Sequence, residues 1–154
     1  KMQGKITKVQ EGYRAEPSVT SGAVIDVSQC PDLVPILTVL AALSKGETHI
    51  VNAARLRYKE SDRLAAMNEV LTILGADVKE HEDGLSIIGK DHLGGGTVSS
   101  HNDHRIAMAA AIASFACTAP VTITGAESVQ KSYPDFWEDF KKMGGLINEF
   151  DMGQ

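Results

Sequence analysis

The sequence predicts an α+β fold of repeated βαβαββ units, with apolar helices inside and sheets outside. Two observations carry this prediction. Short β-branched or alternating runs and longer helical segments follow one another in a regular order. The order recurs after about 70 residues, so that Asp32 falls on Asp103. A period of this length indicates a duplicated unit within one domain rather than a solenoid.

The first unit is expected to span residues 22–90. Its strands are expected over residues 23–27, 48–52, 77–81 and 85–88. Its helices are expected from Pro31 to about Ser44 and from about Lys59 to Leu74. The first helix is apolar almost all round and must therefore be covered on most sides, whereas the second is amphipathic.

The second unit is expected to span residues 96–150. Its strands are expected over residues 97–100, 121–125 and 146–150, and its helices over 103–117 and 133–143. The segments 5–9 and 13–17 are expected to be strands left from an earlier unit. Residues 1–154 are therefore interpreted as part of one domain.

Composition excludes several classes of protein. The chain has 154 residues, 43% of them hydrophobic, which is enough for a core and argues against disorder. A net charge of −5 argues against nucleic acid as a partner, and no apolar run approaches the roughly 20 residues of a membrane span. Cys30 and Cys117 are expected to be buried free thiols. The chain opens at Lys1 without a signal peptide or an initiator Met, so a fragment of a cytoplasmic protein is expected.

Charged residues gather where helices are expected to begin. Lys59 and Arg63 would lie one turn apart on one helix face, Arg105 follows Asp103, which is expected to cap a helix, and Lys131 precedes a helix start. A cation in a first turn opposes the helix dipole at a cost of about 0.3–1 kcal/mol. Each segment taken alone is better explained as a solvated charged face. Recurrence at three helix ends makes a shared anion site an equal alternative.

Four segments resemble motifs of 5-enolpyruvylshikimate-3-phosphate synthases. They are Cys30-Pro31-Asp32, the run Leu56 to Arg63, the run Asn102 to Ala109, and the run Lys131 to Phe136. All four occur in the order and with the spacing of the carboxy-terminal part of that family. The resemblance implies a fold of the α/β prism type with two similar domains, each of three βαβαββ units. The chain would hold about two units of the second domain, and the amino-terminal domain would be absent.

The resemblance implies transfer of the enolpyruvyl group of phosphoenolpyruvate to the 5-hydroxyl of shikimate 3-phosphate, with release of phosphate. Asp32 would bind shikimate 3-phosphate and accept a proton, and Glu60 would be the acid–base residue. Lys59 would bind shikimate 3-phosphate and His104 would assist. The residues that would bind phosphoenolpyruvate are Arg63, Arg105 and Lys131. The family implies no metal and no organic cofactor.

The resemblance also sets limits. Arg55 stands where some members carry Asn, so it is assigned only as a substrate neighbour. The missing amino-terminal domain would complete the site, so this chain alone is expected to be inactive. The full-length protein is expected to be a monomer that binds no membrane.

Three alternatives to this family remain. UDP-N-acetylglucosamine enolpyruvyl transferases lack the Lys59-Glu60-Ser61-Asp62-Arg63 segment. An RNA 3'-phosphate cyclase would need an adenylation histidine and a more basic surface. A non-catalytic anion-binding module would gain nothing from a carboxylate at position 60.

Overall fold

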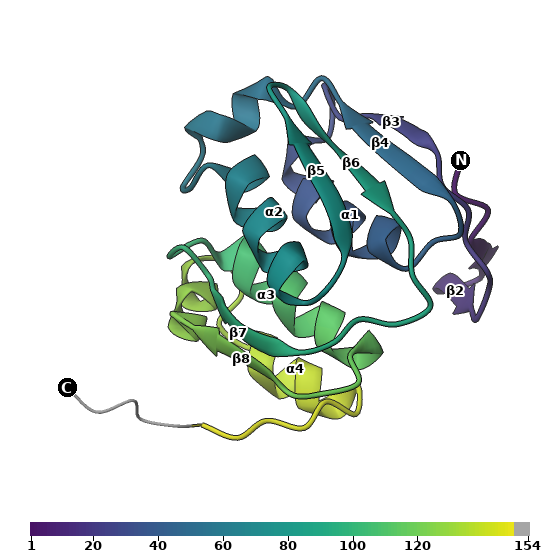
Figure 1. Cartoon of the computed structure of the whole chain (residues 1–154). Helices are drawn as coiled ribbons and strands as arrows, with labels where there is room; N and C mark the ends of the chain where they lie inside the picture. Colours follow the sequence, from purple (N-terminus) through teal and green to yellow (C-terminus); the bar gives the residue numbers. More distant parts are fainter. Residues whose placement is uncertain (150–154) are drawn as a thin grey trace.

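The structure, a computed structural model, describes residues 1–149. A four-stranded sheet has the order β3 (Val24–Asp26), β4 (Glu47–Val51), β6 (Gly84–Ile88), β5 (Asp77–His81). The pair β3–β4 is parallel, whereas β6 pairs antiparallel with both β4 and β5. Helices α1 (Val34–Ala42) and α2 (Arg63–Ile73) lie against its inner face (Figure 1).

The second half repeats part of this arrangement. Strands β7 (Gly96–Ser99) and β8 (Val121–Thr124) form a parallel pair, like β3 and β4. Helix α3 (His104–Ala113) contacts β8, α2 contacts β7, and α4 (Phe136–Lys142) follows β8 in the chain. The exposed hairpin of β1 (Lys5–Val9) and β2 (Gly12–Glu16) forms a separate sheet. The mixture of helices and sheets confirms the predicted α+β class.

The core lies where α1, α2 and α3 meet between the two sheets (Figure 1). Fully buried side chains from these helices include Leu64, Met67 and Ile106. Side chains along β4 and β6 alternate between the two faces of the sheet, as expected when helices cover only one face. Ile50 and Leu85 point inward, while His49 and Ser86 point outward. The apolar helices therefore lie inside and the sheets outside, as predicted.

The second helix begins later than predicted. Residues Ala54–Tyr58 form a 3₁₀ helix, Lys59 is extended (φ −90°, ψ −158°), and α2 starts only at Arg63. The side chain of Asp62 caps α2 by accepting a hydrogen bond from the backbone N–H of Ala65. The prediction that Lys59 and Arg63 share one helix face is therefore wrong.

Other boundaries also differ from the prediction. A 3₁₀ helix (Pro31–Leu33) precedes α1, and α3 ends at Ala113 before another short 3₁₀ helix. Lys131 ends the 3₁₀ helix Ala126–Lys131 and does not begin α4. Residues 146–149 form no strand, and Phe150 of that predicted strand lies outside the described residues. Cys30 and Cys117 are free but only half-buried.

Helix α1 is covered less completely than its composition predicts. Val34 and Val39 are buried, yet Ile36 and Leu40 are 40% and 38% exposed, and Leu33, just before α1, is 50% exposed. Together with α3, this face lines a groove of about 210 Å³. Within residues 1–149, no helix has the length and apolar character needed to span a bilayer.

Candidate functional site

Three cations from separate segments converge on the carboxylate of Asp32, in the 3₁₀ helix before α1. Arg63 Nη1 lies 2.9 Å from Asp32 Oδ1, and Lys59 Nζ lies 3.6 Å from the same atom. Arg105 Nη2 lies 3.5 Å from Asp32 Oδ2. The Asp32 side chain is 48% exposed, so the cluster faces solvent.

The charge of Asp32 follows from these neighbours. Desolvation by partial burial raises the pKa of Asp32, but the charges of Arg105, Lys59 and Arg63 outweigh it and hold the pKa below its ordinary value. Asp32 is therefore ionised at neutral pH. It is an anion placed among cations, and any added anion must compete with it for them.

A buried ion pair between Arg63 and Asp103 holds this cluster in place. Arg63 is 3% exposed and Asp103 is 0% exposed. Arg63 Nε lies 2.7 Å from Asp103 Oδ2, and Arg63 Nη2 lies 3.3 Å from Asp103 Oδ1. Asp103 also caps α3 by accepting from the Arg105 N–H at 3.0 Å, and it accepts from Ser61 Oγ at 3.0 Å. One carboxylate thus ties the loop before α2 to the start of α3.

A second cluster lies beside the first and is centred on Glu60. His104 Nδ1 lies 3.1 Å from Glu60 Oε2, and Lys131 Nζ lies 4.0 Å from the same oxygen. Lys131 Nζ also donates to the carbonyl of Asn102. Side chains alternate in direction along extended backbone, so Lys59 and Glu60 reach different clusters although they are consecutive.

All seven predicted catalytic and substrate-binding residues therefore lie in two neighbouring clusters. The side chains of Glu60, Asp103 and His104 each bring an atom within 4.8 Å of the others, which places the clusters in contact. Helices α2 and α3 both begin here, so their backbone N–H groups add positive potential. The arrangement suits a polyanion, because several cations and helix starts face one exposed region.

A sequence model described as EPSP synthase (3-phosphoshikimate 1-carboxyvinyltransferase) matches residues 1–140. The chain belongs to the EPSP synthase family. The 3-phosphoshikimate 1-carboxyvinyltransferase of Clostridium novyi is 58% identical over 155 residues, which covers 100% of this chain and 36% of the relative. That of Clostridium acetobutylicum is 58% identical over 154 residues with the same coverage. The chain thus spans 36% of the length of these EPSP synthase relatives.

Solved structures agree with this assignment. The EPSP synthase of Acinetobacter baumannii matches with a TM-score of 0.83 at 32% identity, covering 94% of this chain and 36% of that chain. The enolpyruvyl transferase NikO of Streptomyces tendae shares the fold, with a TM-score of 0.75 at 22% identity, covering 96% of this chain and 34% of that chain.

The side chains of Glu60, Asp103 and His104 are close enough to be considered as metal ligands. The Asp103 oxygens already accept hydrogen bonds from Arg63, Ser61 and the Arg105 N–H. The Lys131 ammonium lies 4.0 Å from Glu60 and would repel a metal ion. These three side chains are therefore poorly suited to bind a metal ion.

Arg55 lies apart from the contacts that build the two clusters. Its Nη2 donates to the carbonyl of Ser28, in the loop between β3 and the 3₁₀ helix. Its assignment as a substrate neighbour stays a prediction.

Two further residues, Arg57 and Asp103, hold the site in place, and the sequence predicts neither of them as a functional residue. Arg57 Nη1 contacts Asp62 at 2.9 Å and Glu80 at 2.8 Å, and its guanidinium also donates to two carbonyls of the β5–β6 hairpin. Arg57 thereby fastens the loop that carries Lys59 to that hairpin. The sequence predicts Asp103 only as a helix cap, although its alignment with Asp32 in the repeat is a signal of a further role.

Proposed function

We propose that the full-length protein containing this chain transfers the enolpyruvyl group of phosphoenolpyruvate to the 5-hydroxyl of shikimate 3-phosphate. The observation that carries the proposal is the convergence of Lys59, Arg63 and Arg105 on Asp32, next to Glu60. Both substrates are polyanions, and fixed cations lower the cost of bringing them together.

The reaction is an addition followed by an elimination. The substrate oxygen bonds to C2 of phosphoenolpyruvate while its proton leaves and a proton joins the C3 methylene. In the elimination, C3 loses a proton, the C2–O bond to phosphate breaks, and the double bond re-forms. The first step needs one base near the hydroxyl and one acid near C3, and the second step needs a base near C3.

Asp32 is proposed as the group that binds the hydroxyls of shikimate 3-phosphate and accepts the proton. Its lowered pKa makes it a weak base while Lys59, Arg63 and Arg105 face it. Substrate phosphate and carboxylate groups compete for the same cations. When the cations turn to the substrates, the pKa of Asp32 rises and Asp32 becomes a better base.

Glu60 is proposed as the acid–base residue at C3, assisted by His104. The imidazole lies 3.1 Å from the carboxylate and the His104 side chain is 9% exposed, so it can hold Glu60 in place and exchange a proton with it. A purely anion-binding module has no use for a carboxylate beside Lys131, which favours the catalytic proposal.

The three residues assigned to phosphoenolpyruvate differ in the solvent exposure of their side chains. The side chains of Arg105 and Lys131 are 35% and 42% exposed, which suits direct contact with a carboxylate or phosphate. The three guanidinium nitrogens of Arg63 each already face Asp103 or Asp32. Direct binding of phosphoenolpyruvate by Arg63 therefore requires the contact between Arg63 and Asp32 to break. Lys59, the remaining cation of the cluster, is proposed to bind shikimate 3-phosphate.

The site in this chain is proposed to be incomplete. The chain spans 36% of its relatives, and the groove beside Asp32 exposes Leu33 and Ile36. We propose that residues 22–90 and 96–150 are two of the three units of one domain. The rest of the full-length protein is proposed to cover this groove. The full-length protein is proposed to be a cytoplasmic monomer. The chain alone should then release no phosphate.

Phosphate release from the two substrates tests the function in the full-length protein. Glu60→Gln and Asp32→Ala should each lower kcat by about 100-fold or more, the scale of a general acid or base. Glu138→Gln, at an exposed position of α4, and Asp91→Ala, in the exposed loop after β6, are matched controls that should leave kcat unchanged. Near-normal turnover in Glu60→Gln would remove its assigned role, and substrate binding without turnover in the unaltered protein would support a binding module instead.

A further inference from the structure

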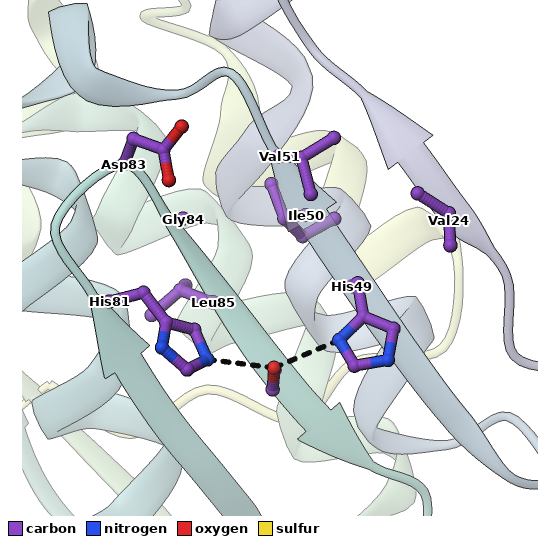
Figure 2. Close-up of a pocket in the computed structure, with 9 residues that line it drawn as sticks. Val24, His49, Ile50, Val51, His81, Asp83, Gly84 and Leu85 are labelled. Atoms are coloured by element: carbon purple, nitrogen blue, oxygen red, sulfur yellow. Dashed lines mark hydrogen bonds between the residues drawn. The ribbon is translucent and has the colours of Figure 1, made fainter.

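A third polar cluster, apart from those around Asp32 and Glu60, lies on the outer face of the four-stranded sheet. It borders an open pocket of about 460 Å³ whose lining includes Val24, His49, His81, Asp83 and Ser86. Figure 2 shows both imidazole rings directed toward one hydroxyl above the sheet. None of these residues belongs to the two clusters around Asp32 and Glu60.

The geometry brings two ring nitrogens from different strands to one point. His49 Nδ1, on β4, lies 2.9 Å from Ser86 Oγ on β6. His81 Nε2, at the end of β5, lies 2.8 Å from the same oxygen. The strand register holds them there, because His49 pairs with Ser86 and His81 pairs with Gly84.

The proton balance shows which nitrogen offers a lone pair. A hydroxyl has one proton, so Ser86 can donate to only one of the two rings. Glu47 Oε2 lies 3.7 Å from His49 Nε2, which favours the tautomer with its proton on Nε2. His49 Nδ1 then presents its lone pair to the pocket, and the carboxylate–imidazole arrangement resembles the outer support of histidine metal ligands.

We propose that His49 and His81 bind one first-row divalent cation of the Zn²⁺ or Ni²⁺ type. Neutral imidazole nitrogen is a preferred ligand of these ions, whereas Mg²⁺ and Ca²⁺ prefer oxygen. The ion takes the place of the shared hydrogen bonds to Ser86. His81, which donates its Nε2 proton to Ser86 in the free protein, binds the ion in the tautomer with its proton on Nδ1, so that Nε2 offers a lone pair, and water completes the coordination. The Asp83 carboxylate, at the edge of the same pocket, adds negative charge.

The two rings must approach each other to hold the ion. Zn–N bonds measure about 2.0–2.1 Å, which is shorter than either contact with the Ser86 hydroxyl. The His49 side chain is 43% exposed and His81 is exposed, so both can adjust without disturbing the core. This proposal is independent of the proposed function.

Calorimetric titration of the chelator-stripped full-length protein with ZnCl₂, and separately with NiCl₂, tests the site. The unaltered protein should bind one ion, and His49→Ala and His81→Ala should each weaken binding at least 10-fold. Glu47→Gln should weaken it about 10-fold, the scale for a residue that orients a ligand. His92→Ala, an exposed histidine outside the pocket, is the matched control and should bind normally. Circular dichroism should show that each variant is folded.

Two results would overturn the proposal. One is the absence of zinc and nickel binding by the unaltered protein. The other is binding that survives both His49→Ala and His81→Ala. A site that is instead lost in His104→Ala would place the ion at Glu60, Asp103 and His104, and would also overturn it.

Discussion

Replacing Asp103 with asparagine removes a negative charge from the interior while keeping a side chain that can cap α3. The charge of Arg63, which is 3% exposed, would lose its closest partner at 2.7 Å. Removing one member of a buried ion pair costs about 3–5 kcal/mol. Arg63 would keep its 2.9 Å contact with Asp32, so a value at the lower end, about 3 kcal/mol, is expected.

A comparison of two helix caps isolates this effect. Asp62 caps α2 as Asp103 caps α3, but its ion pair with Arg57 is partly exposed, at 38% for the Asp62 side chain. Asp62→Asn should therefore cost about 1 kcal/mol or less. Asp103→Ala should cost about 1 kcal/mol more than Asp103→Asn, because alanine also removes the cap.

Urea unfolding of the full-length protein measures these costs, since a shift of the midpoint at constant slope reports a change in stability. Adding Arg63→Met to Asp103→Asn should cost less than the two single changes summed, because no unpaired charge remains buried. Equal costs for Asp103→Asn and Asp62→Asn, or a cost below about 1 kcal/mol for Asp103→Asn, would refute the reasoning.

Three further predictions follow from the same structure. Burial raises the pKa of Asp103, but contacts with Arg63, the Arg105 N–H and Ser61 outweigh it and lower the pKa. The stabilisation that the Asp103 carboxylate provides should be complete above its unfolded pKa of about 3.9 and should be lost as pH falls through its lower folded pKa. In Asp103→Asn, the free energy of unfolding should therefore fall less steeply as the pH is lowered. The proposed binding of phosphoenolpyruvate by Arg105 predicts that Arg105→Lys raises the KM for phosphoenolpyruvate about 10-fold with a smaller change in kcat, because a point charge replaces a two-pronged donor. An unchanged KM would contradict that proposal. Gly89→Ala should cost about 2 kcal/mol in urea unfolding, since its Cβ would lie 1.5 Å from a backbone oxygen, whereas Gly4→Ala meets only a contact at 3.8 Å and should be neutral.

Local sequence patterns determined the order of helices and strands, since each depends on residues a few positions apart. The Asp103 cap, the alternation along β4 and β6, and the apolar character of α1 were all readable in this way. The four motifs, which resemble those of the family to which the chain belongs, also contain all seven candidate residues.

Only the tertiary structure decided how those residues are arranged. Lys59 and Glu60 proved to lie before α2, because Asp62 caps the helix and Arg57 fastens the loop to a distant hairpin. Arg63 turned out to be buried against Asp103, 40 residues away, and the cations divided into two clusters. Periodicity reports which face of a segment is apolar, but not which side chain from another segment meets its polar groups, and that depends on how the helices and sheets pack.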